Sequence, residues 1–108
     1  MRNNIGYAKH LKGDYDGALR EFRLSRDVFE TAKRPREVRI ADWMIAWTLR
    51  AQKKYGEALA MQLELERQWA AAGDSDPYVF EEIEALYRAL GNATEADRYA
   101  AKLKAARQ

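Results

Sequence analysis

The chain contains no cysteine, and proline and glycine are scarce. Without cysteine, disulfides and thiolate metal sites are excluded, and the sequence is compatible with a reducing or an oxidising compartment. Two prolines and six glycines leave long stretches open to regular structure. No run of about eighteen apolar residues occurs and Met1 is not followed by a hydrophobic signal region, so we expect no membrane segment and a cytoplasmic location.

The chain also lacks a large excess of positive or negative charge. The 19 basic and 17 acidic side chains leave a net charge of +2, too small for the long-range field of a general nucleic-acid or membrane binder. Hydrophobic residues make up 47% and charged residues 33%, which is typical of a soluble globular protein. At 108 residues, we expect one domain spanning 1–108.

Groups that commonly carry catalysis are nearly absent. His10 is the only histidine, and only Ser25 and Ser75 could act as serine nucleophiles, neither with a nearby histidine and acidic residue in sequence. No glycine loop of the phosphate-binding type occurs. We therefore predict a protein without enzymatic activity, without a cofactor and without a metal site.

The residues between the glycines and prolines favour helices. They are rich in Ala, Leu, Glu, Arg and Lys, and their apolar residues recur at steps of three and four, which indicates helices with one buried face. An aspartate before Pro77 predicts one helix start, and Asn92 with Glu95 predicts a reciprocal capping box at another. The predicted all-α chain has six helices, at residues 2–12, 14–31, 36–52, 55–72, 77–90 and 93–107.

An internal repeat organises these helices. The hexapeptides at 13–18, 53–58 and 91–96 align so that alanine recurs at intervals of 40 and 38 residues, and an isoleucine stands thirteen residues before each alanine. The aligned residues are Ala18, Ala58 and Ala96, and Ile5, Ile45 and Ile83. Such a period predicts stacked helical hairpins.

The first copy resembles a tetratricopeptide repeat (TPR). Ile5-Gly6 in one helix, the turn Gly-Asp-Tyr-Asp-Gly-Ala-Leu at 13–19 and Phe22 in the next helix match the pattern of that family. The resemblance implies a superhelix of three antiparallel hairpins, with repeats at about 1–34, 35–74 and 75–108. It also implies that the small residue lets two helices cross closely beside the aromatic ring. The second copy departs at Gln62, in the aromatic position, and the third has Glu84 and Ala100 at two of the motif positions.

The resemblance implies a concave groove, lined by the first helix of each repeat, that binds a peptide or protein segment. The groove residues predicted to contact it are Asn4, Tyr7, Trp43, Met44, Trp47, Arg50, Tyr78, Glu82 and Arg88. Some members of the family bind acidic tails through a clamp of lysines, asparagines and an arginine. Here the matching positions hold Asn3, Tyr7, Met44, Tyr78 and Glu82, so we do not expect an acidic tail as ligand.

The middle of the groove is unusually apolar, because Asp42 is the only charged residue between Ile40 and Leu49. Trp43 and Trp47 lie on one face of this predicted helix. Three interpretations stay open: the indoles bind a ligand, they pack inside the chain, or they meet a second copy in a homodimer.

One end of the groove carries several carboxylates. Glu81, Glu82 and Glu84 would favour a ligand with basic residues, or they form an ordinary solvated face.

Overall fold

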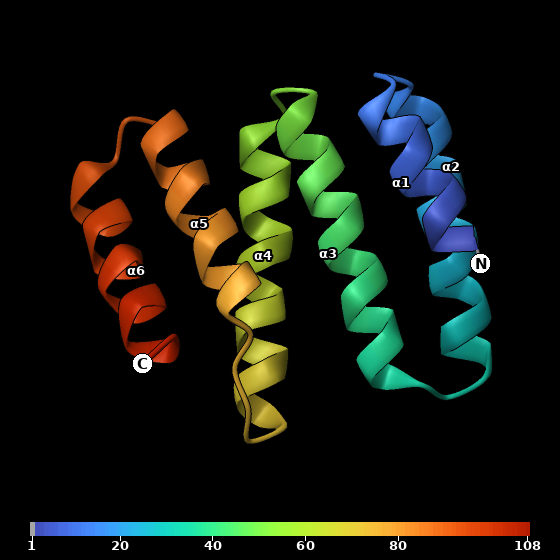
Figure 1. Cartoon of the computed structure of the whole chain (residues 1–108). Coiled ribbons are helices and arrows are strands. Elements are labelled where there is room, and N and C mark those ends of the chain that lie inside the picture. Colours follow the sequence, from blue (N-terminus) through green and yellow to red (C-terminus); the bar gives the residue numbers. More distant parts are fainter. Residues whose placement is uncertain (1) are drawn as a thin grey trace. The chain divides into compact units, whose positions relative to one another are not determined.

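The structure is a computed structural model that describes the backbone of residues 2–108 and the side chains from residue 4 onward, so the side chain of Asn3 lies outside the described residues. It contains six helices and, within the described range, no strand (Figure 1). They are α1 (Arg2–Leu11), α2 (Tyr15–Thr31), α3 (Pro35–Ala51), α4 (Tyr55–Ala71), α5 (Pro77–Ala89) and α6 (Ala93–Ala106). Every boundary lies within one residue of the prediction, and the predicted all-α class is confirmed.

The helices form two compact units, residues 1–54 and 55–108. In the first unit, α2 packs against α1 and α3. In the second, α5 packs against α4 and α6. Consecutive helices within each unit run antiparallel (Figure 1). The division falls inside the second predicted repeat, and the single domain spanning 1–108 stays a prediction.

Side-chain caps begin three helices. Asp14 and Asp76 accept hydrogen bonds from the backbone N–H groups of Gly17 (3.0 Å) and Tyr78 (2.9 Å). Asn92 accepts one from the N–H of Glu95 (3.2 Å). The reciprocal half of the predicted capping box is wrong, because the Asn92 N–H donates to the carbonyl of Tyr87 at the end of the preceding helix.

Five helix ends share one turn, in which a residue with positive φ follows the last helical turn. At the first, the N–H of Gly13 donates to the carbonyl of His10 and the N–H of Asp14 to that of Lys9, the two hydrogen bonds of a Schellman motif. Gly73 and Gly91 hold the same position, where glycine has no steric cost. Lys33 and Lys53 occupy this position in the other two turns, with φ of 58° and 64°. These turns therefore form without the glycine by which such a turn is recognised in a sequence.

The crossing of α1 over α2 requires a glycine. Phe22 is completely buried, and a Cβ atom on Gly6 would lie 2.5 Å from its ring. The small residue and the aromatic ring therefore have the roles that the resemblance implies. Ile5 does not pack in the core as the aligned isoleucines do. It is 50% exposed, whereas Ile45 and Ile83 are 4% and 0% exposed. In its own unit α1 packs mainly against α2 and reaches α3 through Tyr7 and His10, and this packing leaves half of Ile5 exposed.

Replacing Gly6 by alanine is expected to lower the free energy of unfolding by about 1–2 kcal/mol. The added methyl group would displace the buried Phe22 ring at a cost of about 1–3 kcal/mol, which exceeds the gain of about 0.5–1 kcal/mol in helix propensity. Urea unfolding followed by circular dichroism measures the difference. Gly56→Ala is the matched control, because a Cβ there meets nothing within 4 Å, and it should not destabilise the chain. Equal effects of the two substitutions would contradict the proposed clash.

The second and third repeats fill the aromatic position differently. Gln62 is completely buried, and neither of its amide atoms has a hydrogen-bond partner among the described residues. In the third repeat Tyr99, one residue before Ala100, is 2% exposed and its ring lies beside those of Phe80 and Tyr87. The alignment of the three repeats does not reveal this role, because Tyr99 stands one residue before the aligned aromatic position.

Candidate functional site

Four aromatic side chains of the first unit form a stack, which we call the aromatic cluster: Tyr7, His10, Trp43 and Trp47. The Trp47 ring lies 3.4 Å from that of His10 and 5.7 Å from those of Tyr7 and Trp43, with interplanar angles of 5°, 14° and 18°. Residues three or four apart lie on the same side of a helix, so α1 supplies Tyr7 and His10 together and α3 supplies both tryptophans. The cluster therefore joins two helices that are not neighbours in sequence.

Exposure differs strongly within the aromatic cluster. His10 is buried, Trp43 and Trp47 are half-buried, and Tyr7 is 47% exposed. The indoles thus pack within the chain and still leave part of their surface uncovered. Internal packing and ligand binding, two of the interpretations left open by the sequence, are compatible in this arrangement.

His10 is held by a chain of hydrogen bonds. Its Nδ1 lies 3.0 Å from the hydroxyl of Thr48, and that hydroxyl donates to the carbonyl of Met44 (2.9 Å). Since the hydroxyl proton is directed to Met44, Nδ1–H is the donor to Thr48. Burial, and secondarily the positive charge of Arg50, lower the pKa of His10. The imidazole is therefore a neutral packing partner of Trp47 at pH 7, a role that the sequence does not reveal.

Acidification is expected to destabilise the chain through His10. Its folded pKa lies below the ordinary value of 6.5, so as the pH falls below 6.5 the unfolded chain binds a proton before the folded chain does. Stability is thus complete above the ordinary pKa and decreases as the pH falls through it. Urea unfolding between about pH 7.5 and 5, above the range of ordinary carboxylates, measures this slope. His10→Gln should flatten the profile, and an unchanged slope would contradict the assignment.

The other predicted groove residues of the first unit lie near the aromatic cluster in sequence. Asn4 is exposed on α1, three residues before Tyr7, and so lies on the same side of the helix. Met44 and Arg50 are half-buried on α3, each three residues from Trp47. Asp42, the only charge in this apolar stretch, is partly buried, and its Oδ1 accepts a hydrogen bond from Arg26 Nε of α2 at 2.6 Å. Burial nevertheless raises the pKa of Asp42.

The predicted residues of the second unit have different surroundings. Tyr78 is 63% exposed. Glu82 is only 4% exposed, so it is not the exposed carboxylate that the sequence predicts. The guanidinium of Arg88 pairs with Glu84 at 2.9 Å and with Asp97 of α6 at 3.1 Å, and thereby links α5 to α6.

The acidic residues at one end of the predicted groove have basic partners. Glu84 pairs with Arg88, and Glu81 pairs with Arg107 at 2.6 Å. The expected preference for a basic ligand at this position therefore loses its basis. Helical periodicity correctly predicts that these residues belong to one helix, α5. It cannot predict the basic partner of Glu81, because Arg107 stands at the end of another helix, α6.

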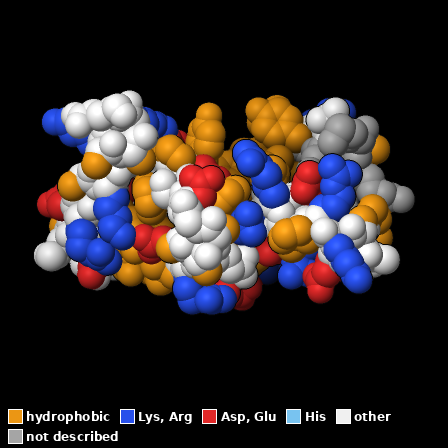
Figure 2. Space-filling view, turned by 90° about the horizontal axis from the view of Figure 1, so that it is seen from below, with side chains coloured by type: hydrophobic (Ala, Val, Ile, Leu, Met, Phe, Trp, Pro, Cys, Tyr) orange, Lys and Arg blue, Asp and Glu red, His pale blue; other side chains and the backbone are white. Residues whose placement is uncertain are grey.

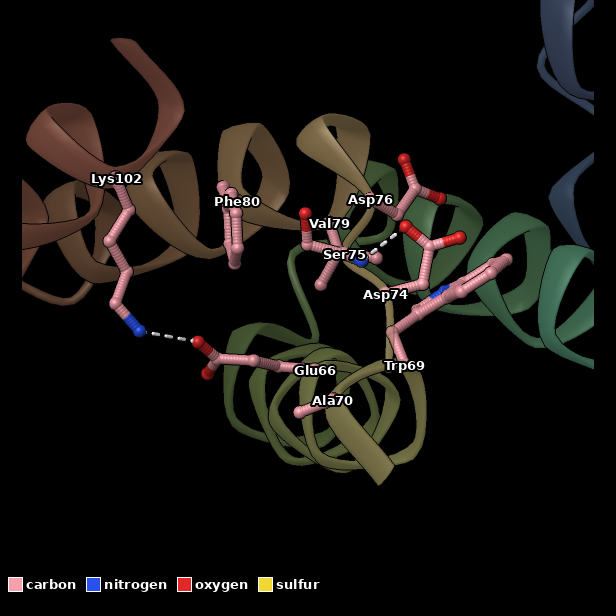
Figure 3. Close-up of a pocket in the computed structure, with 9 residues that line it drawn as sticks. All are labelled: Glu66, Trp69, Ala70, Asp74, Ser75, Asp76, Val79, Phe80 and Lys102. Atoms are coloured by element: carbon pink, nitrogen blue, oxygen red, sulfur yellow. Dashed lines mark hydrogen bonds and ion pairs between the residues drawn. The ribbon is translucent and has the colours of Figure 1, made fainter. Parts of the chain in front are cut away.

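The second unit contains a pocket that the sequence does not predict. It has a volume of about 180 Å³ and lies among α4, the turn before α5, α5 itself and α6 (Figure 3). Its lining residues are Glu66, Trp69, Ala70, Asp74, Ser75, Asp76, Val79, Phe80 and Lys102. No local sequence signal marks this pocket, because its residues come from four segments.

One end of the pocket is closed by an ion pair. Lys102 Nζ lies 2.7 Å from Glu66 Oε2, and the hydroxyl of Tyr99 donates to Glu66 Oε1 at 2.5 Å. Burial, followed by this contact with Glu66, raises the pKa of Tyr99 to about 12, so the phenol keeps its proton. The Lys102 ammonium also lies 5.6 Å from the centre of the Phe80 ring, within cation–π range.

The surface shows no extended field of one sign on the face seen in Figure 2, where basic and acidic side chains are interspersed. No helix among the described residues combines the length and apolar character needed to cross a membrane. Within the same residues, no three histidine, aspartate or glutamate side chains gather as metal ligands.

Comparison with known proteins gives one strong structural likeness. No protein-family model matches the chain, and no curated protein matches it. The chain is similar to the crystal structure of the TPR domain of Arabidopsis FLU, with a TM-score of 0.83 and 21% sequence identity, covering 96% of this chain and 89% of that one. At this identity the likeness is one of fold.

Proposed function

Because the chain has the tetratricopeptide-repeat fold, as the sequence predicts, we propose that it is a non-enzymatic scaffold that binds a peptide or protein segment. The aromatic cluster is the proposed centre of the binding surface. Asn4, Met44 and Arg50, which flank it in sequence, complete the surface in the first unit. In the second unit, exposed Tyr78 is a separate contact candidate. Glu82 and Arg88 are left out, since the first is buried and the second is engaged with α6.

The observation that carries this proposal is the partial exposure of three large rings in a prearranged stack. Tyr7 is 47% exposed and both indoles are half-buried. Tryptophan and tyrosine supply much of the binding energy in protein interfaces, because they bury large areas at a low cost in conformational entropy. Since neighbouring rings already fix one another, little ordering is required when a ligand covers them.

Trp43→Ala tests the proposal. Partners captured from the native lysate by the intact chain are identified, and the affinity of each purified partner is then measured by calorimetry. We expect Trp43→Ala to weaken binding by about 2 kcal/mol or more. Leu24→Ala on α2 is the control, because Leu24 is a large apolar side chain that is 47% exposed and lies outside the aromatic cluster. Unchanged affinity of a folded Trp43→Ala variant would refute the proposed surface.

A homodimer is the second candidate, with the apolar α3 covered by a second copy. The 43% exposure of Ile40 on α3 favours it, since this large apolar side chain remains uncovered. Light scattering across a concentration series separates the two candidates. A persistent dimer that dissociates on substitution of Trp43 would support self-association, whereas a monomer at every concentration would exclude it.

A further inference from the structure

We propose that the pocket of the second unit binds an apolar side chain of a polypeptide in which the next residue is lysine or arginine. This goes beyond the proposed function, because the pocket and the aromatic cluster have no residue in common. The inference depends on three observations. They are the size and lining of the pocket, the Glu66 carboxylate at one end, whose two oxygens already accept hydrogen bonds, and the Asp74 carboxylate at the other end.

The lining selects an apolar side chain. Trp69 and Val79 are 7% and 1% exposed, and with Ala70 and Phe80 they supply apolar surface around the pocket. At about 180 Å³ the pocket exceeds the cavity of about 150 Å³ that accommodates benzene in another protein, so a leucine or phenylalanine side chain fits. Burial of such a group is favourable because it removes apolar surface of both partners from water.

The lysine end of the pocket offers nothing to a second cation. Both carboxylate oxygens of Glu66 are engaged, one by Tyr99 and the other by Lys102. The Lys102 ammonium lies 4.9 Å from the Tyr99 ring and 5.6 Å from the Phe80 ring. A basic ligand residue at this end would meet a like charge without an available acceptor, which is unfavourable.

The opposite end of the pocket is acidic. Asp74 belongs to the turn before α5, is exposed and accepts a hydrogen bond from the N–H of Ser75 at 2.8 Å. Among the described residues no basic side chain lies within ion-pair distance of it. In Figure 3 the Asp74 and Asp76 carboxylates lie on the side of the pocket away from Lys102. A ligand cation is therefore attracted to the Asp74 end while the neighbouring apolar group enters the pocket.

Two dipeptides that differ in the sign of one side-chain charge test the proposal on the full chain. Acetyl-phenylalanyl-arginine amide and acetyl-phenylalanyl-glutamate amide are titrated into the ¹⁵N-labelled protein and followed by NMR. The arginine peptide should shift the amide signals of Ser75, Val79 and Phe80 saturably, with an affinity on the order of millimolar. The glutamate peptide should bind at least about fivefold more weakly, since it places a like charge beside Asp74.

Two variants localise the binding. Asp74→Asn should weaken the arginine peptide about two- to fivefold and leave the affinity for the glutamate peptide equal or higher. Ala70→Trp should fill the pocket and abolish saturable shifts, whereas Ala60→Trp is the control, because Ala60 is also exposed on α4 and lies outside the pocket. Absence of saturation up to about 10 mM, equal affinity of the two peptides, or shifts confined to the aromatic cluster would each overturn the proposal. Because the expected shifts and both substitutions lie in the second unit, failure here leaves the proposed function of the aromatic cluster untouched.

Discussion

Trp47→Ala is expected to lower the free energy of unfolding by about 3 kcal/mol. The Trp47 indole is the central ring of the aromatic cluster and contacts Tyr7, His10 and Trp43. Each aromatic pair contributes about 0.5–1.5 kcal/mol beyond its buried area, and a fully buried Trp→Ala change costs about 3–5 kcal/mol. Because Trp47 is only half-buried, we expect the lower end of that range. Urea unfolding monitored by circular dichroism measures the loss.

Trp47→Phe serves as the comparison for this prediction. A phenyl ring keeps an aromatic face for His10 and Tyr7, so its cost should be less than half that of alanine. A loss below about 1 kcal/mol for Trp47→Ala would show that the cluster contributes little to folding. This expected destabilisation is also the reason to test ligand binding with Trp43: a change in affinity at Trp47 would combine a lost contact with a less stable unit.

Gln62→Met is expected to raise the free energy of unfolding by about 1–3 kcal/mol. Gln62 is completely buried, and neither its amide nitrogen nor its amide oxygen has a hydrogen-bond partner among the described residues. A buried amide without partners costs about 1–3 kcal/mol in proteins, and methionine has a similar length and shape without that cost. For a chain of this size the midpoint of thermal unfolding should rise by about 5 °C or more.

Gln68→Met is the matched control for Gln62. Gln68 lies on the same helix and its Nε2 donates to Glu64 at 3.0 Å near the surface, so its replacement should change stability by less than about 0.5 kcal/mol. A less stable Gln62→Met variant would contradict the prediction. It would show that the Gln62 amide has hydrogen-bond partners in solution. An apolar side chain is expected to fit at position 62, because the equivalent residue of the first repeat is Phe22, whose ring is completely buried.

Local sequence signals predicted the helices well because each boundary depends on nearby residues. Asp76 before Pro77 and Asn92 before Ala93 both cap the helices that they were expected to begin. Gly6 and Phe22 also have their predicted packing roles, since close helix crossing needs a residue without a side chain. In the turns at Lys33 and Lys53, the backbone forms the same hydrogen bonds with a residue that carries no turn signal.

The candidate sites were predicted less completely. Helical periodicity correctly placed Trp43 and Trp47 on one side of α3, but it could not show that His10 of α1 stacks on Trp47. It also could not show that Glu81 pairs with Arg107 and Glu84 with Arg88. The pocket beside Phe80 escaped prediction altogether, because it exists only where several segments meet.

The sequence by itself determined the number of helices, their limits and the repeat that orders them, since these depend on propensities, caps and spacings within a few residues of the chain. The tertiary structure alone decided which side chains are paired, stacked or left open. Whether Glu82 is buried, Tyr7 exposed or Gln62 without a partner depends on neighbours distant in sequence. Packing brings those neighbours together through many weak contacts that no single segment encodes.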